Sequence, residues 1–432
     1  MTKHHQEDRF TSPAALAHLK RRNREDVRFK LWGVFGILVA VTALVVLIGT
    51  MAGNGLSAFH QTQIKVPIHF NAEVIDPSGK RDPKELRGAN YRKIVSHSMR
   101  TLFPDVKKRR DKRALRDLLS VGVPYTLADM VVADPSLIGT TKELWVVASD
   151  DIDMLTKGYI DPTVPQSERR VKDNALAWVE KLKAEERIEK HWNKDFFSRG
   201  DSREPEQAGI KGAIVGSLLT LLVTFFVSFP IGLFTAVYLE EFAPKNKWTD
   251  IIEVNINNLA AVPSIVFGLL GLAVFINVMH IPRSAPVVGG LTLALMTLPT
   301  IIIATRAALK AVPPSIRDAA RGLGASPLQV VIHHVVPLAI PGILTGTIIG
   351  MAQALGETAP LLMIGMVAFI VDIPQSPMDA ATVMPVQIYL WADSPERAFV
   401  EKTAAATLVL LGFLVVMNAI AVMLRRRFER RW

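Results

Sequence analysis

The sequence lacks the residues and motifs on which several large classes of protein depend. It has no cysteine, which excludes disulfide bonds and thiolate metal sites. It has no G-x4-G-K-S/T motif, so a P-loop for ATP is excluded as well. None of its ten histidines stands at a metal-binding helical spacing, and the adjacent His333 and His334 project in different directions. We therefore expect neither a metal site nor a cofactor bound by this chain.

Charge is absent, or nearly so, from six long stretches of the chain. Residues 31–51, 212–239, 259–279, 285–305 and 403–424 have no charged side chain, and residues 338–371 have only Glu357. About 20 apolar residues in a helix cross the hydrocarbon core of a bilayer. The sequence therefore predicts an all-α polytopic membrane protein with six transmembrane helices. The run at 338–371 is too long for one straight crossing, and Pro341 and Pro360 predict a bent or interrupted segment.

Acidic residues are scarce near the two ends of the chain. Residues 1–30 carry eight Lys and Arg against four acids, and residues 425–432 carry five against one. Both basic segments flank a terminal span, and the positive-inside rule places such segments in the cytoplasm. This placement favours a membrane orientation over nucleic-acid binding. The first span, 31–51, is longer than the apolar part of a signal peptide and lacks a convincing cleavage site, so we expect it to remain as an anchor.

With both termini in the cytoplasm, residues 52–211 form a large extracytoplasmic segment between the first two spans. Its hydrophobic pattern predicts an inserted α+β domain, with strands at 66–75 and 143–148 and helices at 90–103 and 172–197.

Two charged motifs of this segment each leave two interpretations open. The basic cluster at 107–116 could attract anions near the membrane, or it could be the solvated face of a helix. The acidic triplet Asp150, Asp151 and Asp153 could bind a divalent ion, but no glycine-turned calcium loop surrounds it.

The loop at 311–337, which faces the cytoplasm in this topology, predicts two short helices joined by a turn. The first covers 316–323, and Gly324 offers a left-handed residue after it. The second covers 327–336 and begins with a serine-proline pair that suits a helix start. Pro337 interrupts the pattern where the next apolar run starts.

The spacing of this loop resembles the EAA motif, E-A-A-x3-G-x9-I-x-L-P, of ABC importer permeases. The matching residues are Asp318, Ala319, Ala320, Gly324, His334, Val336 and Pro337. Asp318 replaces the glutamate, which is a mild change, whereas His334 replaces an apolar residue. The resemblance implies that the helix pair docks into a groove on a separate ATPase subunit and transmits its closure to the membrane helices. Ala319 and Ala320 form one patch with almost no side chain, which would let that surface approach the backbone. An ordinary amphipathic connector between two spans is the alternative.

Three further stretches, at 261–271, 291–300 and 354–362, resemble the PstA type of phosphate permease. The resemblance covers about residues 210–424, and it covers 52–211 more weakly. It implies a type I ABC importer permease core of five spans at 212–424. It also implies an inner-membrane subunit that translocates phosphate without catalysing a covalent step.

The same resemblance implies a set of partners. These are a homologous second permease, a pair of ATPase subunits that hold ATP and Mg, and an extracytoplasmic phosphate-binding protein. Two other functions stay open. The chain could be a permease for another oxyanion, or a membrane-anchored sensor or scaffold of phosphate state with residues 52–211 as its receiver. A pure sensor needs neither a cytoplasmic helix pair at this spacing nor a carboxylate inside an apolar run.

Glu357 lies in an apolar run, where a charge at the bilayer centre costs roughly 2.5–3.5 kcal/mol. A carboxylate also repels an anionic substrate, so three interpretations arise. Glu357 could pair with a cation, it could be protonated, or it could accept bonds from backbone N–H groups freed at a helix break. Many relatives have an arginine at the position of Gln353. Here the cation must come from Arg306 or from the partner permease, and we favour the partner.

Proline positions predict where the spans are interrupted. The predicted helix breaks are at Pro263, Pro299 and Pro360. Interrupted helices in transporters commonly turn backbone groups toward the substrate. The predicted translocation path therefore contains Glu357, Thr358, Ser264 and Arg306.

Overall fold

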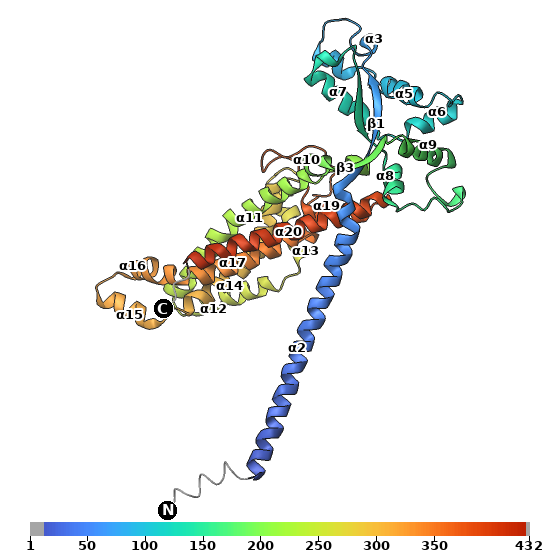
Figure 1. Cartoon of the computed structure of the whole chain (residues 1–432). Helices are drawn as coiled ribbons and strands as arrows, with labels where there is room; N and C mark the ends of the chain where they lie inside the picture. The colour runs from blue at the N-terminus through green and yellow to red at the C-terminus, as the bar shows by residue number, and fades with distance from the viewer. Residues whose placement is uncertain (1–12, 429–432) are drawn as a thin grey trace, which may run out of the picture. The chain divides into compact units, whose positions relative to one another are not determined.

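The computed structural model describes residues 13–428 (Figure 1). The chain divides into two compact units, residues 1–54 and 55–432, which we describe separately. The described part of the first unit belongs to one helix, α2 (Pro13–Gly55). The side chains of α2 between residues 31 and 48 are exposed although nearly all of them are apolar. A helix that is apolar on every side suits a lipid environment, as the predicted first span requires.

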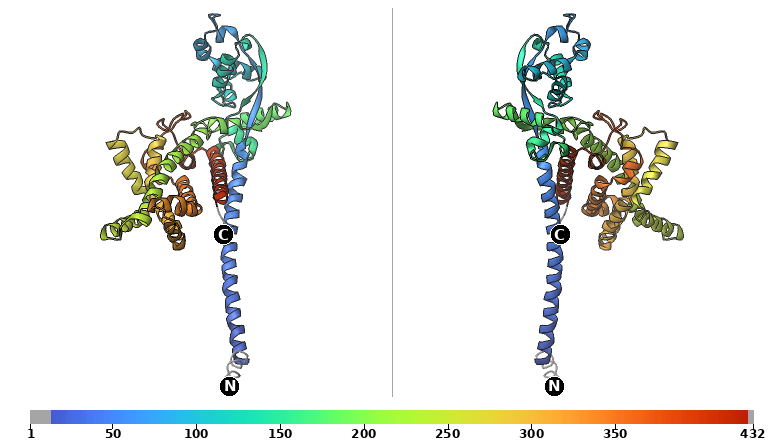
Figure 2. Two further views of the ribbon diagram at one scale, coloured as in Figure 1. Left: turned by 90° about the vertical axis from the view of Figure 1, so that its left-hand side faces the viewer. Right: turned by 90° about the vertical axis from the view of Figure 1, so that its right-hand side faces the viewer.

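The second unit starts with a three-stranded antiparallel sheet, seen from two sides in Figure 2. Its strands are β1 (His60–His69), β2 (Thr141–Val147) and β3 (Ile188–Trp192). β1 lies in the centre, so the strand order is β2-β1-β3. Ile64, Val66 and Ile68 of β1 alternate along the strand and are fully buried. One face of the sheet therefore carries the core, and helices cover that face.

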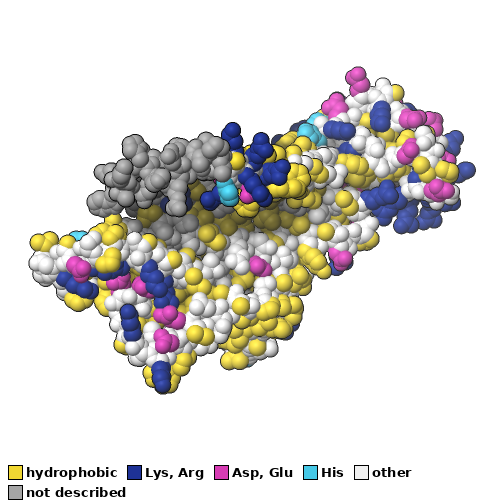
Figure 3. All heavy atoms as spheres, turned by 90° about the horizontal axis from the view of Figure 1, so that it is seen from below, with side chains coloured by type: hydrophobic (Ala, Val, Ile, Leu, Met, Phe, Trp, Pro, Cys, Tyr) yellow, Lys and Arg dark blue, Asp and Glu magenta, His cyan; other side chains and the backbone are white. Residues whose placement is uncertain are grey.

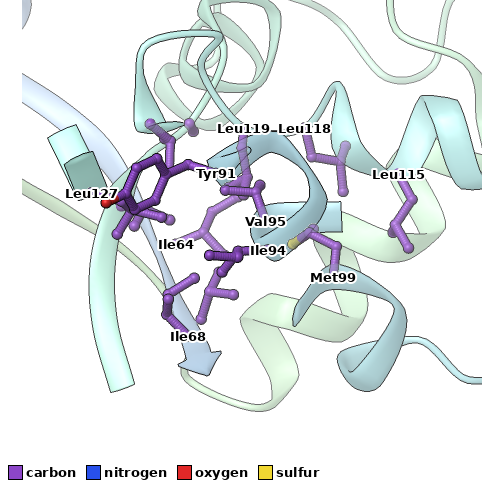
Figure 4. Packing of buried hydrophobic residues seen from close by; sticks show 14 of the residues in the cluster. Ile64, Ile68, Tyr91, Ile94, Val95, Met99, Leu115, Leu118, Leu119 and Leu127 are labelled. Atoms are coloured by element: carbon purple, nitrogen blue, oxygen red, sulfur yellow. The ribbon is translucent and has the colours of Figure 1, made fainter. Parts of the chain in front are cut away.

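The helices of this domain follow the strands closely along the chain. They are α3 (Ala72–Ile75), α4 (Pro83–Gly88), α5 (Tyr91–Leu102), α6 (Arg109–Arg116), α7 (Val123–Ala133), α8 (Asp150–Lys157), α9 (Asp173–Ala184) and α10 (Lys194–Ser198). Figure 4 shows how Ile94, Val95 and Met99 of α5 lie among Ile64 and Ile68 of β1. The sheet and its helices thus share one hydrophobic core.

The sequence located some of these elements and misplaced the end of another. The strand predicted at 143–148 is confirmed as β2, and the helix predicted at 90–103 is confirmed as α5. The strand predicted at 66–75 is wrong in its last third. There the side chain of Asn71 accepts a hydrogen bond from the backbone N–H of Glu73, which starts the helical turn α3.

The helix predicted at 172–197 is wrong in its second half. The helix α9 ends at Ala184, and Glu186 adopts a left-handed backbone with φ of 52°. The chain then returns as β3, which pairs with β1. Short polar-apolar alternation in 188–192 fits a strand at a sheet edge as well as a helix, and pairing with β1 decides between them.

Five helices within residues 13–428 are long and apolar enough to cross a membrane. They comprise α2 and four helices of the second unit: α11 (Lys211–Val237), α14 (Pro286–Lys310), α17 (Val336–Gly356) and α20 (Arg397–Phe428). A sixth crossing is obtained only if α12 (Lys247–Ala260) and α13 (Ser264–Gly271) count as one bent span. The bend between them is 101°, so the span predicted at 259–279 is not a straight helix.

The long helices pack into a bundle in which α14 lies between α11 and α17, and α20 packs on α17 (Figure 1). Small residues allow these helices to approach closely. A Cβ atom on Gly290 of α14 would lie 2.5 Å from the Cβ of Val223 in α11, and one on Gly346 of α17 would overlap Ala304 of α14. On the face seen in Figure 3, charged side chains gather toward the ends, and hydrophobic and uncharged groups cover the middle of the bundle. This distribution suits a bilayer around the bundle.

The proline positions have two different outcomes. Pro263 immediately precedes α13, and Pro360 lies in the first turn of α18 (Ala359–Met363), so the chain is broken at both predicted positions. Pro299 lies inside α14, so the break predicted there is wrong, and Pro341 lies inside α17 in the same way. An interior proline removes one backbone hydrogen bond, and a helix packed among other helices tolerates that loss.

The long apolar run at 338–371 is thus one helix, a break and one short helix. Beyond α18 the chain has no regular structure until α19 (Met384–Ala392). In that connection Asp379 accepts hydrogen bonds from the backbone N–H groups of Gln375 and Ser376, at 2.9 and 2.8 Å. These bonds hold the pKa of the Asp379 carboxyl below its usual value.

Candidate functional site

The loop at 311–337 forms a helix, a turn and a second helical segment. The first helix, α15, covers Pro314–Gly322, close to the predicted 316–323. Gly324 has a φ of +88°, a left-handed conformation that favours glycine, so the predicted turn is confirmed. The second segment starts at α16 (Pro327–Val330), where Ser326 and Gln329 cap each other reciprocally.

The second segment does not end where the sequence predicted. A π-helical turn at Val331–Val335 joins α16 directly to α17, and Pro337 lies in the first turn of α17. The interruption predicted at Pro337 is therefore wrong. The wider turn absorbs the proline because the first turn of a helix has backbone N–H groups without helical partners. The turn of this loop is consequently attached to a membrane-spanning helix without a flexible joint.

The two alanines of the motif face different environments, so the single patch predicted for them is wrong. Ala320 is buried against Leu309 and Val330, whereas Ala319 and Asp318 are exposed. The exposed side of the loop carries Leu323, which is 90% exposed, together with Leu328 and Ile332. Exposed apolar side chains rimmed by polar residues are typical of a protein-binding surface. The sequence pattern did not single out these three residues.

Arg317 ties α15 to the ends of two membrane helices. Its guanidinium donates two hydrogen bonds to the carboxylate of Glu241, with Nη2–Oε1 at 2.6 Å and Nε–Oε2 at 3.3 Å. It also donates to the backbone oxygens of Val312, at 2.7 Å, and Leu309, at 3.0 Å. Glu241 belongs to the turn that follows α11, and Leu309 belongs to the last turn of α14. A bidentate pair of this kind fixes geometry as well as charge.

A second ion network lies beside it. Arg306 of α14 reaches Glu240 after α11, with Nε–Oε2 at 3.3 Å, and Glu253 of α12, with Nη2–Oε1 at 2.6 Å. Lys310 also approaches Glu240, at 3.6 Å. Sequence reasoning assigned Arg306 to the translocation path and left Glu240 and Glu241 aside. Adjacent acids at a helix end, facing basic residues of a following loop, were the available signal.

The two broken regions of the apolar core lie against each other. The helix α13, which starts at Ser264, packs on α18, which follows Glu357 and Thr358. A Cβ atom on Gly268 of α13 would lie 2.7 Å from the Cα of Pro360, so the two backbones are in close contact. The structure therefore brings the short helices that begin at Ser264 and Ala359 together. Irregular backbone at this depth is tolerated where it is buried in protein or lines a cavity.

Glu357 ends α17, and its side chain is half-buried. Within residues 13–428 its carboxylate has no hydrogen bond and no ion pair. The interpretation in which it accepts bonds from freed backbone N–H groups finds no such bond there. Arg306 is bound to Glu240 and Glu253, so the interpretation in which Arg306 neutralises Glu357 is wrong for this chain. Gln353, at the position where many relatives have arginine, is exposed.

The acidic triplet of the sheet domain has a structural role in its third member. Asp153 accepts a hydrogen bond from the backbone N–H of Thr62, at 2.8 Å, and pairs with Lys157, at 2.7 Å. Lys157 also pairs with Glu401 of α20, at 2.6 Å, and all three charged side chains are at most 10% exposed. The residues that the structure describes contain no group of three or more ligands that could hold a metal ion. The triplet thus helps to join the sheet domain to α20.

The comparison with known proteins assigns the membrane part of the chain to a family. Residues 228–431 match the family described as "Binding-protein-dependent transport system inner membrane component". "Phosphate transport system permease protein PstA 1" of Mycobacterium tuberculosis (strain CDC 1551 / Oshkosh) is 31% identical over 229 residues, which cover 52% of this chain and 74% of that relative. The chain belongs to this family of inner-membrane transport components. It is therefore a multi-pass membrane permease that works in a binding-protein-dependent system, in which ATP hydrolysis belongs to a separate subunit.

Other similar proteins cover the same region of this permease. "Phosphate transport system permease protein PstA" of Pasteurella multocida (strain Pm70) is 31% identical over 221 residues, covering 50% of this chain and 76% of that relative. Among solved structures, a chain of the MetNI methionine ABC transporter is 20% identical and matches with a TM-score of 0.41, covering 50% of this chain and 95% of that chain. Residues 16–166 match a domain family of unknown function, DUF3333. The sheet domain thus lies largely outside the region shared with the permeases.

Proposed function

We propose that this permease is the PstA-type membrane subunit of an ATP-driven importer for inorganic phosphate. The observation that carries this proposal is the similarity to phosphate permeases, at about 30% identity over about three quarters of their length. The coupling loop supports it independently, because α15 offers an exposed apolar surface and is tied to three helices by Arg317. Such a loop converts movement of a docked partner into movement of the bundle.

The topology that we propose follows the charge distribution. The N-terminal segment 1–30 and the tail 425–432 lie in the cytoplasm, 31–51 is the first span, and 52–211 is an extracytoplasmic domain inserted before the permease core at 212–424. Counting α12 and α13 as one bent crossing gives six spans, and this places the loop at 311–337 on the cytoplasmic side. An ATPase there can reach α15.

The partners that we propose are a second, homologous permease, a pair of ATPase subunits with ATP and Mg, and an extracytoplasmic phosphate-binding protein. Asp318, Ala319 and Gly324 lie on the exposed turn that would meet the ATPase, and Ala320 and Pro337 support it from behind. ATP-driven closure of the ATPase pair would push α15, and Arg317 would carry this push to the ends of α11 and α14. This permease itself makes and breaks no covalent bond.

Glu357 is proposed to act on the translocation path together with Thr358 and Ser264. A half-buried carboxylate without a partner in its own chain can be neutralised by a proton or by a cation of the second permease. Either route lowers the electrostatic barrier for an anion, which an unpaired carboxylate would raise. We favour a cation across the permease interface, because Arg306 is already bound elsewhere.

The test is uptake of labelled phosphate by the complete importer in liposomes, with ATP inside and the binding protein outside. We expect ATP-dependent uptake that excess unlabelled phosphate abolishes and that sulfate, molybdate and phosphonate do not. If one of those anions competes as well as phosphate, the substrate is another oxyanion. If no anion is moved by a complete assembly and no ATPase co-purifies with this chain, the sensor function replaces transport.

A further inference from the structure

A charged cavity that the proposed transport mechanism does not use lies between the sheet domain and the start of the last membrane helix. Its volume is about 420 Å3. It is enclosed by the first turn of α8, the segment 159–170 and the first turn of α20. Figure 1 shows α8 beside the start of α20, and the buried ion pair between Lys157 and Glu401 joins these two helices. The walls of the cavity are thus held in place by the fold.

Three arginines of this cavity are available to an anion. Arg169, Arg170 and Arg397 line it. The side chain of Arg169 is only 7% exposed, and its Nη2 atom pairs with Asp173. Its Nε and Nη1 atoms are buried and have no hydrogen-bond partner among the described residues. Buried N–H groups of a charged side chain without acceptors are unfavourable, so an anionic group bound in this cavity would stabilise Arg169.

Four carboxylates line the same cavity and call for a cation. They are Asp150, Asp151, Asp161 and Glu168. Burial raises the pKa of both Asp150 and Asp151, and the neighbouring charge of Asp151 raises that of Asp150 further. Arg170 approaches Asp151 only to 3.8 Å. Negative charge is therefore incompletely compensated at one part of the cavity, while positive charge is uncompensated at another.

The cavity lies at the depth of lipid headgroups. Arg397 stands six residues before Thr403, where the predicted last span begins, and Ser57 stands six residues after Met51, where the first one ends. The hydroxyl of Tyr159, which lines the cavity, is 2.9 Å from that of Ser57. Six helical residues extend about 9 Å. The headgroup layer occupies roughly 5–8 Å on each side of the hydrocarbon core, so the cavity opens at its outer edge.

We infer that this cavity binds the headgroup of a zwitterionic phospholipid, with the phosphate at Arg169 and Arg397 and a primary ammonium group at Asp150 and Asp151. An anionic headgroup such as phosphoglycerol offers nothing to the four carboxylates. Free phosphate likewise brings no cation to them. A trimethylammonium group has no N–H to donate, whereas a primary ammonium has three. Phosphatidylethanolamine therefore fits better than phosphatidylcholine, and phosphatidylcholine better than phosphatidylglycerol. This inference depends on the membrane location of the permease and not on the anion that it transports.

The test measures lipid retained by the purified full-length permease complex. Native mass spectrometry is applied after exchange into detergent with phosphatidylethanolamine, phosphatidylcholine or phosphatidylglycerol of identical acyl chains. We expect the apparent affinity for phosphatidylethanolamine to exceed that for phosphatidylglycerol by about tenfold or more, because only the former satisfies both charged walls. Equal retention of the three lipids, or displacement of phosphatidylethanolamine by millimolar inorganic phosphate, would overturn the inference.

Two sets of variants separate the two ends of the site. Arg397→Gln, on an exposed residue, and Arg169→Gln should each lower retention of phosphatidylethanolamine and phosphatidylcholine about tenfold. Asp150→Asn with Asp151→Asn should remove the preference for phosphatidylethanolamine over phosphatidylcholine while binding persists. Arg283→Gln is the matched control, because Arg283 is exposed, unpaired within residues 13–428 and separate from the cavity. Equal losses in the Arg397 and Arg283 variants would refute the site, and phosphate uptake, measured in parallel, reports separately on the proposed transport function.

Discussion

Replacing Arg317 by methionine should loosen the coupling loop without unfolding the bundle. One guanidinium holds α15 through two bonds to Glu241 and two to backbone oxygens. The side chain of Arg317 is 16% exposed and that of Glu241 is 8% exposed, so the pair is largely shielded from water. Removing one partner of a buried ion pair costs about 3–5 kcal/mol, because the other charge remains buried and unpaired. We take the lower value, about 3 kcal/mol, since Arg317 retains some exposure.

This free energy has a direct local readout. A loss of about 3 kcal/mol raises the equilibrium constant for local opening by about 150-fold. Hydrogen exchange of backbone amides in α15, followed by mass spectrometry on the purified permease, measures that change. Peptides from α14 and α20 serve as internal references that should exchange as in the wild type.

The loop itself supplies the control. Arg321→Met removes a contact with Asp318 at 4.0 Å, in which the side chains are 60% and 73% exposed. Exposed pairs contribute about 0–1 kcal/mol, so this variant should exchange at nearly the wild-type rate. Glu241→Leu combined with Arg317→Met should recover part of the lost protection, because no buried charge is then unpaired. If Arg317→Met and Arg321→Met exchange alike, Arg317 does not anchor the loop and the coupling role assigned to it fails. In the complete importer, Arg317→Met should hydrolyse ATP with less phosphate moved per ATP than Arg321→Met.

Three further predictions concern the broken helices and the junction with the sheet domain. Glu357→Gln should lower phosphate uptake at least tenfold while assembly with the ATPase is unchanged, and normal uptake would show that the charge is dispensable; Gln353→Ala, at an exposed neighbouring position, is its control. Gly268→Ala should destabilise the permease by about 1–3 kcal/mol in thermal unfolding, because its Cβ would lie 2.7 Å from the Cα of Pro360, whereas Gly412→Ala, with open space around it, should not. Burial raises the pKa of Glu206 above its usual 4.5, although Ser120 donates a hydrogen bond to it. Its protonated form is thus favoured in the folded state, and the stability it contributes is full below pH 4.5 and falls as the pH rises through the higher folded-state value; Glu206→Gln should make thermal unfolding less dependent on pH between 4.5 and 8, and an unchanged pH dependence would contradict this.

The sequence by itself determined the features that depend on local patterns. Runs of apolar residues gave the membrane helices, because a helix of fixed rise must match the thickness of the bilayer. The helix pair around Gly324 followed from caps and from a residue that tolerates a left-handed backbone. The resemblance to importer permeases rested on the spacing of that same loop. Each of these signals is carried by residues that are neighbours along the chain.

The tertiary structure alone decided which distant groups meet. Arg317 pairs with Glu241, which lies 76 residues earlier, and Arg306 pairs with Glu240 rather than Glu357. Pro299 leaves its helix intact, because neighbouring helices hold it, although Pro263 and Pro360 interrupt theirs. The segment 188–192 is a strand because β1 supplies its hydrogen-bond partners. In every case the free energy comes from burial and pairing between segments far apart in the chain, and residue order does not specify that proximity.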